Sequence, residues 1–152
     1  MAERIAAACG GSVEGLTLAA LGLTFKPNTD DMRDSPSLAF LPILREASAA
    51  IRAFDPEGMA EAKKLMPELD FCADAYQAMD GADALILITE WNEFRGLDLG
   101  RVKQLLRQPV VIDLRNIYRP EEMLAAGLDY HSIGRPSSVS NSRKPAALRA
   151  IG

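Results

Sequence analysis

A charged connection joins two apolar stretches between residues 21 and 37, with the sequence LGLTFKPNTDDMRDSPS. It carries Lys26 and Arg33 together with the aspartates Asp30, Asp31 and Asp34. A lysine ammonium meets a phosphate as a point charge, whereas an arginine guanidinium can bind one with two parallel N–H donors. The acids would repel a phosphate unless they cap backbone amides or pair with the bases. The connection is therefore either an anion-binding loop or a solvated turn with surface ion pairs.

Further candidate residues follow two later apolar runs. Arg115 comes directly after PVVIDL, and Glu90 and Trp91 come after ADALILI. In an open parallel sheet, ligands bind outside the carboxyl ends of the strands, so these residues and the first loop should converge on one edge. Arg115 is the strongest candidate of the three, since Trp91 also suits packing and Glu90 also suits a surface charge. His131 is the only histidine, and we expect it to be structural.

The elements that must position these residues alternate regularly along the chain. Short apolar runs typical of strands are followed by longer amphipathic stretches typical of helices. This alternation predicts an α/β fold, a Rossmann-like doubly wound, mainly parallel sheet of about six strands with helices on both faces. The expected strand order is 3-2-1-4-5-6, with a flavodoxin-like order as the competitor. The expected strands are 16–23, 49–54, 69–71, 82–88, 109–114 and 128–133, and the expected helices are 37–47, 58–66, 74–81, 97–106 and 120–127.

Length and composition limit the classes of function. A chain of 152 residues with 48% hydrophobic content suits one domain with a core. Its 21 acidic against 17 basic side chains argue against nucleic acid or an anionic membrane as main partner. Cys9 and Cys72 are far apart and form neither a disulfide framework nor a zinc pattern, which suits a reducing cytoplasm. We expect no secretory signal, no membrane-spanning stretch and no metal site.

The glycine pattern differs from that of a dinucleotide-binding domain. Such a domain carries G-x-G-x-x-G directly after its first strand. Here Gly10, Gly11 and Gly15 precede that strand, and only Gly22 lies near its end. We therefore do not expect this sheet to bind a dinucleotide in the usual way.

Four segments in order along the chain identify a family by resemblance. The segments are GLTFKPNTDDMRDSPS, the FDP at Phe54–Pro56, GADALILITEWNEF and PVVIDLRNIY. Together they resemble the C-terminal, UDP-binding domain of the UDP-glucose/GDP-mannose dehydrogenase family. The match covers about Gly15 to Pro136. It implies three parts: the end of a connector helix at 1–14, a UDP-sugar-binding Rossmann-like domain at 15–136, and a mobile tail at 137–152.

The resemblance also implies an activity and roles for particular residues. The UDP-glucose-oxidising members form UDP-glucuronate with two NAD+, through a covalent thiohemiacetal on a cysteine, and are expected to be homo-oligomers. Carried over by position, Phe25, Lys26 and Arg115 are expected to contact the substrate, and Arg33 the phosphates of NAD. The family's nucleophilic cysteine segment and its cofactor motif do not occur here. No catalytic residue is therefore expected in this chain, which should need an N-terminal NAD-binding half as its partner.

Three alternatives remain open from the sequence. The substrate of the complete enzyme could be GDP-mannose or an N-acetylated UDP-sugar in place of UDP-glucose. The chain could instead be a non-enzymatic nucleotide-binding module. It could also be an α/β interaction or receiver-like domain in which Asp30 and Asp31 bind Mg2+.

Overall fold

The sheet has six parallel strands in the order β3-β2-β1-β4-β5-β6. The structure is a computed structural model that describes residues 1–133, so the tail expected at 137–152 lies outside the described residues. The predicted fold class and strand order are confirmed, and the flavodoxin-like order is wrong. The expected domain boundaries stay predictions. The strands are β1 (Thr17–Leu21), β2 (Ala50–Phe54), β3 (Asp70–Phe71), β4 (Ala84–Leu87), β5 (Val110–Asp113) and β6 (Asp129–Ser132).

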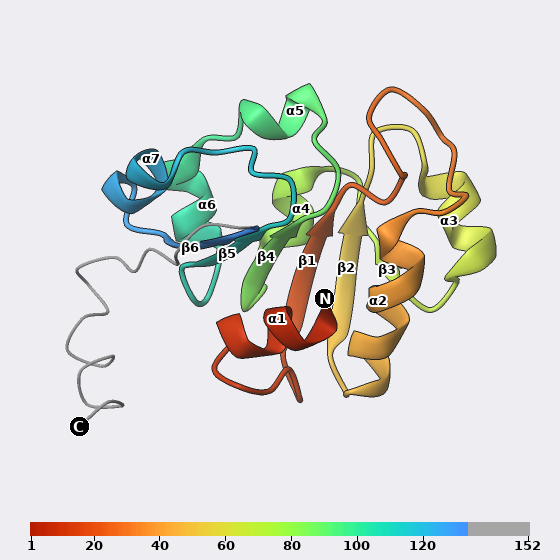
Figure 1. Cartoon of the computed structure of the whole chain (residues 1–152), viewed down its shortest axis with the longest axis horizontal. Helices are drawn as coiled ribbons and strands as arrows, with labels where there is room; N and C mark the ends of the chain where they lie inside the picture. Colours follow the sequence, from red (N-terminus) through yellow and green to blue (C-terminus); the bar gives the residue numbers. More distant parts are fainter. Residues whose placement is uncertain (134–152) are drawn as a thin grey trace.

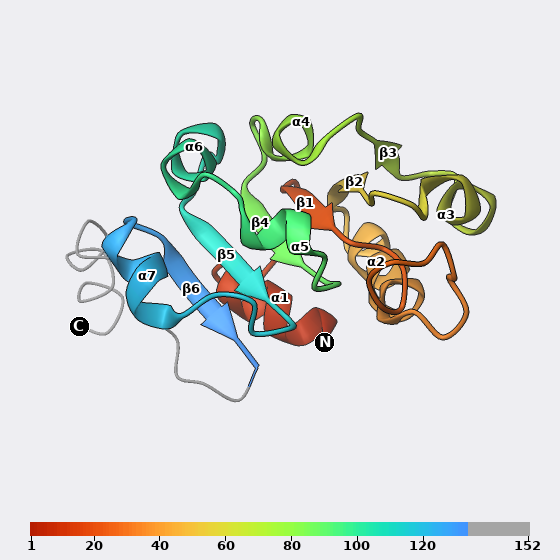
Figure 2. The ribbon, with the colours of Figure 1, turned by 90° about the horizontal axis from the view of Figure 1, so that it is seen from above.

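Helices cover both faces of this sheet. Figure 2 shows α1, α2 and α3 on one face and α4, α6 and α7 on the other. Right-handed crossovers between parallel strands account for the faces of the helices that connect strands, whereas α1 precedes β1. The five amphipathic stretches each form the expected helix. A further one-turn helix, α5, was not predicted, because four residues are too few to show a helical period. The helices are α1 (Ala2–Ala8), α2 (Pro36–Glu46), α3 (Met59–Leu65), α4 (Ala75–Met79), α5 (Asn92–Arg95), α6 (Leu99–Leu105) and α7 (Pro120–Ala125).

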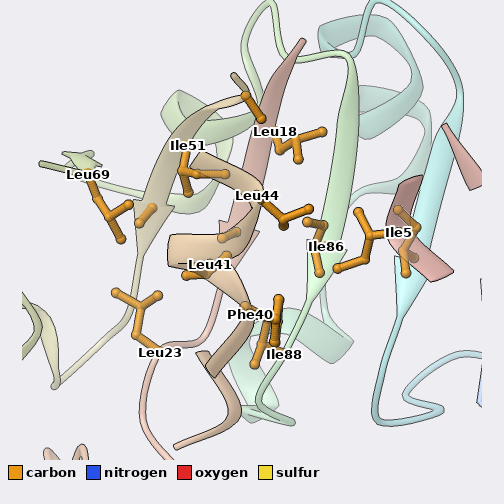
Figure 3. Packing of buried hydrophobic residues seen from close by; sticks show 14 of the residues in the cluster. Ile5, Leu18, Leu23, Phe40, Leu41, Leu44, Ile51, Leu69, Ile86 and Ile88 are labelled. Carbon is orange, nitrogen blue, oxygen red and sulfur yellow. The ribbon is translucent and has the colours of Figure 1, made fainter. Parts of the chain in front are cut away.

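Two apolar layers, one on each face of the sheet, form the core. Alternate residues of a strand enter opposite layers, so Leu18 and Ala20 of β1 face α2 while Ala19 and Leu21 face the other layer. Figure 3 shows the first layer, in which Leu41 and Leu44 of α2 pack against the sheet. Burial on both faces explains why the central strands are continuous apolar runs. Within residues 1–133, no helix is long and apolar enough to span a membrane.

The chain leaves the sheet earlier than the first apolar run suggests. β1 ends at Leu21, because Gly22 has a φ of +88° and turns the backbone away. A Cβ at this position would lie 2.6 Å from Thr89 Cβ and 2.7 Å from the Thr89 backbone nitrogen. The exits of β1 and β4 therefore pass in close contact at the point where the strand order reverses, and the first loop begins there (Figure 1).

Candidate functional site

A buried carboxylate joins the exits of β1 and β2. Asp55 directly follows β2 and is 1% exposed. Its Oδ2 accepts hydrogen bonds from the backbone N–H groups of Leu23 and Thr24, at 2.7 and 3.1 Å. Its Oδ1 accepts from those of Glu57 and Gly58, at 2.9 and 2.7 Å. A buried carboxylate without such donors would be strongly unfavourable, so Asp55 fixes the start of the first loop.

This arrangement differs from that of a dinucleotide-binding sheet. There, an acidic residue near the end of the second strand binds the ribose hydroxyls. Here the oxygens of Asp55 are occupied by backbone donors, and a Cβ at Gly58 would lie 2.5 Å from Thr24 Cγ2. The space next to Asp55 is filled by the chain itself. The geometry agrees with the glycine pattern in disfavouring a conventional dinucleotide site.

The far end of the first loop is held at the exit of β1, where the loop also begins. The hydroxyl groups of Ser35 and Ser37 both donate to the carbonyl oxygen of Leu23. Ser35 is also the N-cap of α2 and accepts from the N–H of Ser37 at 3.2 Å. Between these anchors, the N–H of Phe25 donates to the carbonyl oxygen of Asp31 at 3.2 Å. The loop therefore closes on itself and presents residues 26–30 beyond a narrow base.

Within this loop, Arg33 is paired with Asp31. Its Nε and Nη2 donate to Oδ1 and Oδ2 at 3.0 and 2.9 Å, and its backbone N–H also donates to Oδ1, at 2.9 Å. These side-chain and backbone hydrogen bonds lower the pKa of the Asp31 carboxyl to about 2. The Arg33 side chain is 89% exposed. The charge of Asp31 is thus matched inside the loop, which removes part of the expected repulsion of an anion.

Arg115 links three segments of the candidate site. Its Nε donates to the carbonyl oxygen of Ile88 at 2.9 Å, and its Nη2 donates to that of Phe25 at 3.1 Å. Nε also lies 3.6 Å from Oε2 of Glu90, and the side chains of Arg115 and Glu90 are 31% and 29% exposed. Among residues 1–133, no hydrogen-bond partner is seen for Nη1 of Arg115. One guanidinium therefore joins the exits of β1, β4 and β5 and keeps donor capacity for a ligand.

A second buried carboxylate, Asp113 at the end of β5, directs Arg115. Its Oδ1 accepts from the backbone N–H of Arg115 at 3.0 Å. Its Oδ2 accepts from the N–H groups of Ile117 and Tyr118, at 2.7 and 3.1 Å, and from the Tyr130 hydroxyl at 2.6 Å. These bonds fold the chain after β5 into a tight turn. The direction in which Arg115 leaves the sheet is therefore set by buried groups.

The predicted site residues occupy two neighbouring regions of the edge. Phe25 is half-buried and bonded to Arg115, and Lys26 is exposed, with Nζ 5.4 Å from the centroid of the Phe25 ring. Arg33 instead lines a groove of about 710 Å³ that also includes Glu61 and Leu65 of α3. Neither Phe25 nor Arg115 lines that groove. The structure thus brings together the residues predicted for substrate and places the residue predicted for cofactor beside them.

A recess also opens between the loop and the exits of β2 and β4. It measures about 400 Å³ and is lined by Asn28, Thr29, Asp30, Glu57 and Trp91. Trp91 is 7% exposed and packs in the second core layer, in line with the packing role that the sequence allowed.

The two cysteines lie outside these regions. Cys9 lines a hollow with Asp83 and Gln108, which precede β4 and β5, so it is at the opposite end of the sheet. Burial, with a smaller contribution from Asp83, raises its pKa to about 11. Cys72 is 5% exposed, and burial likewise raises its pKa. A raised pKa makes a thiol a poor nucleophile at neutral pH, and the absence of a catalytic role for these two cysteines stays a prediction.

Comparison with known proteins places this chain in a family. Residues 19–120 match the model of the UDP-glucose/GDP-mannose dehydrogenase family, UDP binding domain. The chain belongs to this family. It is 53% identical over 136 residues to a UDP-glucose 6-dehydrogenase of Rhizobium meliloti (strain 1021), covering 90% of this chain and 31% of that protein. It is 47% identical over 128 residues to the UDP-glucose 6-dehydrogenase TuaD of Bacillus subtilis (strain 168), covering 84% and 28%.

A solved structure gives the same fold. The UDP-D-ManNAc dehydrogenase from Pyrococcus horikoshii aligns with a TM-score of 0.68 and 28% identity, over 88% of this chain and 28% of that protein. The chain thus spans about a third of the length of these relatives. Family membership confirms the resemblance inferred from the sequence motifs, while the roles of individual site residues stay predictions.

Sequence reasoning did not find the residues that build this edge. Asp55 directly follows β2 and Asp113 ends β5, and neither was given a structural role. A signal was present, since an acid that ends a buried strand just before a turn can accept the N–H groups of the next residues. The contacts of Asp55 to Leu23 and of Arg115 to Phe25, however, span 32 and 90 residues. No local pattern contains them.

Proposed function

We propose that the carboxyl edge of this domain binds the UDP part of a nucleotide sugar through Phe25, Lys26 and Arg115. The observation that supports this most is the bond from Arg115 Nη2 to the Phe25 carbonyl oxygen, at 3.1 Å. It holds a guanidinium beside the segment that carries the exposed ammonium of Lys26. Two cations held at one sheet edge suit a diphosphate, and the half-buried Phe25 offers an apolar surface.

We propose further that the complete protein is an NAD-dependent UDP-glucose 6-dehydrogenase. The 53% identity to the Rhizobium meliloti enzyme favours UDP-glucose over GDP-mannose or an N-acetylated UDP-sugar. Oxidation of an alcohol to a carboxylate removes four electrons, and each of two NAD+ accepts two of them as a hydride. Cys9 and Cys72 do not suit the nucleophile, so this domain binds and orients the substrate. An N-terminal half would hold most of the cofactor, with Arg33 reaching its phosphates.

Titration calorimetry with UDP tests the role of the edge. The 152-residue chain should bind UDP, and Lys26→Ala should weaken binding about tenfold, since a hydrogen bond to a charged group contributes about 1.5 kcal/mol or more. Lys63→Ala is the matched control, because Lys63 is also exposed and its Nζ lies 5.5 Å from the Phe71 ring centroid. Equal affinities for the two variants, or no UDP binding by either the chain or the complete protein, would contradict the proposal.

The other two candidate functions have less support. In the receiver-like alternative Asp31 would bind Mg2+, but both of its oxygens accept from Arg33. The non-enzymatic module predicts UDP binding without any dehydrogenase activity in the complete protein. Assay of NADH formation with UDP-glucose distinguishes that alternative. The homo-oligomeric assembly and the cytoplasmic location expected from the sequence stay predictions.

A further inference from the structure

We propose that Asp31 is a positioning residue that orients Arg33 as an end-on clamp for a phosphate of the dinucleotide. This inference rests on the proposed function, in which Arg33 reaches the cofactor. It assigns to Asp31 a role different from the metal binding or general loop shaping that its residue type suggests. It also explains why the acidic Asp31 lies two residues before Arg33, whose proposed role is to bind an anionic phosphate.

Two hydrogen bonds, from Nε and Nη2 of Arg33 to the Asp31 carboxylate, form a fork between the two side chains. This fork leaves part of the guanidinium available. A guanidinium carries five N–H donors. Asp31 takes the donor on Nε and one on Nη2, at 3.0 and 2.9 Å. The donors on Nη1 and the second donor on Nη2 stay on the outer end of the group. With the Arg33 side chain 89% exposed, this end can meet two oxygens of a phosphate without breaking the fork.

Asp31 is itself fixed by the base of the loop. Its carbonyl oxygen accepts from the N–H of Phe25 at 3.2 Å, and its own N–H donates to Thr29 Oγ1 at 3.1 Å. Its side chain is 22% exposed. The position of the Arg33 guanidinium is therefore tied, through Asp31, to the segment that carries Phe25 and Lys26. The residues proposed to contact the substrate and the residue proposed to contact the cofactor would thus be held by the same segment, the base of the first loop.

Two opposite effects of Asp31 can be compared in size. Its negative charge weakens the attraction of Arg33 for a phosphate, but across the guanidinium and in solvent this amounts to less than about a twofold change in affinity. Holding a long, otherwise free side chain in its binding orientation is worth about three- to tenfold. Orientation is the larger effect, so removing Asp31 should weaken cofactor binding even though it removes a repulsive charge.

Steady-state kinetics of the complete dehydrogenase test this proposal. Asp31→Ala should raise KM for NAD+ about three- to tenfold and leave KM for UDP-glucose within about twofold, because the backbone bond to Phe25 remains. Asp31→Asn should have an intermediate effect, since it keeps a neutral acceptor. The double variant Asp31→Ala/Arg33→Ala should match Arg33→Ala alone. Asp30→Ala is the matched control, because it removes the adjacent exposed acid but not the fork.

A spectroscopic readout on the 152-residue chain separates orientation from folding. The Arg33 Nε–H proton should be protected from solvent exchange and lose that protection in Asp31→Ala, while the backbone amide spectrum is otherwise kept. If Asp31→Ala unfolds the chain, the proposal is tested with Asp31→Asn, by its KM for NAD+ and by the solvent protection of the Arg33 Nε–H proton.

The failures of the two proposals are distinguishable. If Arg33→Ala leaves KM for NAD+ unchanged, the cofactor role of Arg33 is wrong. If Arg33→Ala raises it but Asp31→Ala lowers it, or acts no more strongly than Asp30→Ala, only the role of Asp31 is overturned.

Discussion

The buried carboxylate of Asp55 should contribute strongly to stability, and Asp55→Asn tests this with little change in shape. The asparagine carbonyl oxygen can accept from one pair of backbone donors, either Leu23 and Thr24 or Glu57 and Gly58. The other pair then faces an NH2 group that cannot accept. Two backbone donors, at least one of them buried, then lose their partners at about 1–3 kcal/mol each, so we expect a loss of about 3–5 kcal/mol.

Urea unfolding followed by circular dichroism measures this loss. A domain of this size has a free energy of unfolding of about 5–15 kcal/mol, so the change would be a large fraction of the total. It corresponds to a fall in Tm of about 6–20 °C. Asp30→Asn is the control, since Asp30 is exposed in the same loop and undergoes the same chemical change. A loss below about 1 kcal/mol for Asp55→Asn, similar to the control, would refute the reasoning.

Three further outcomes are expected. Gly22→Ala should lower the free energy of unfolding by about 2–4 kcal/mol in thermal melts. Gly11→Ala is the control and should cost less, because Gly11 also has a positive φ but a Cβ there would have no neighbour within 4 Å. Equal losses would exclude the contact with Thr89 as the cause. The Asp31 carboxyl should titrate near pH 2 by NMR and near 4 in Arg33→Ala. Since its pKa is lowered on folding, the fork stabilises the loop above about pH 4 and loses this effect as the pH falls through about 2; a midpoint near 4 in the unmodified chain would contradict the pairing. Cys9, with a pKa of about 11, should be alkylated at pH 8 at least about tenfold more slowly than a free cysteine, and an equal rate would show that its thiol is not buried.

Much of the fold was predictable because its signals are local. Strands buried on both faces must be apolar throughout, and the helices between them show one apolar side, so their order appears directly in the sequence. Ser35 and Pro36 mark the start of α2 for a similar reason, since a cap bonds to a residue only two positions away. The helix α5 was missed because it has a single turn. Most strand ends were placed one or two residues too far out, because backbone turns such as that at Gly22 end a strand inside an apolar run, whereas the carboxyl ends of β2 and β3 were placed correctly.

The sequence by itself predicted a candidate site at the carboxyl ends of parallel strands, and it named the loop and the cations that the structure places at that edge. Only the tertiary structure decided how these cations are held. Arg115 bonds to the carbonyl oxygens of Ile88 and Phe25, and Asp55 joins the exits of two strands. The physical reason is the range of the interactions. A cap or an apolar stripe repeats within one turn, whereas a hydrogen bond between distant strand ends depends on where the whole sheet places its donors and acceptors.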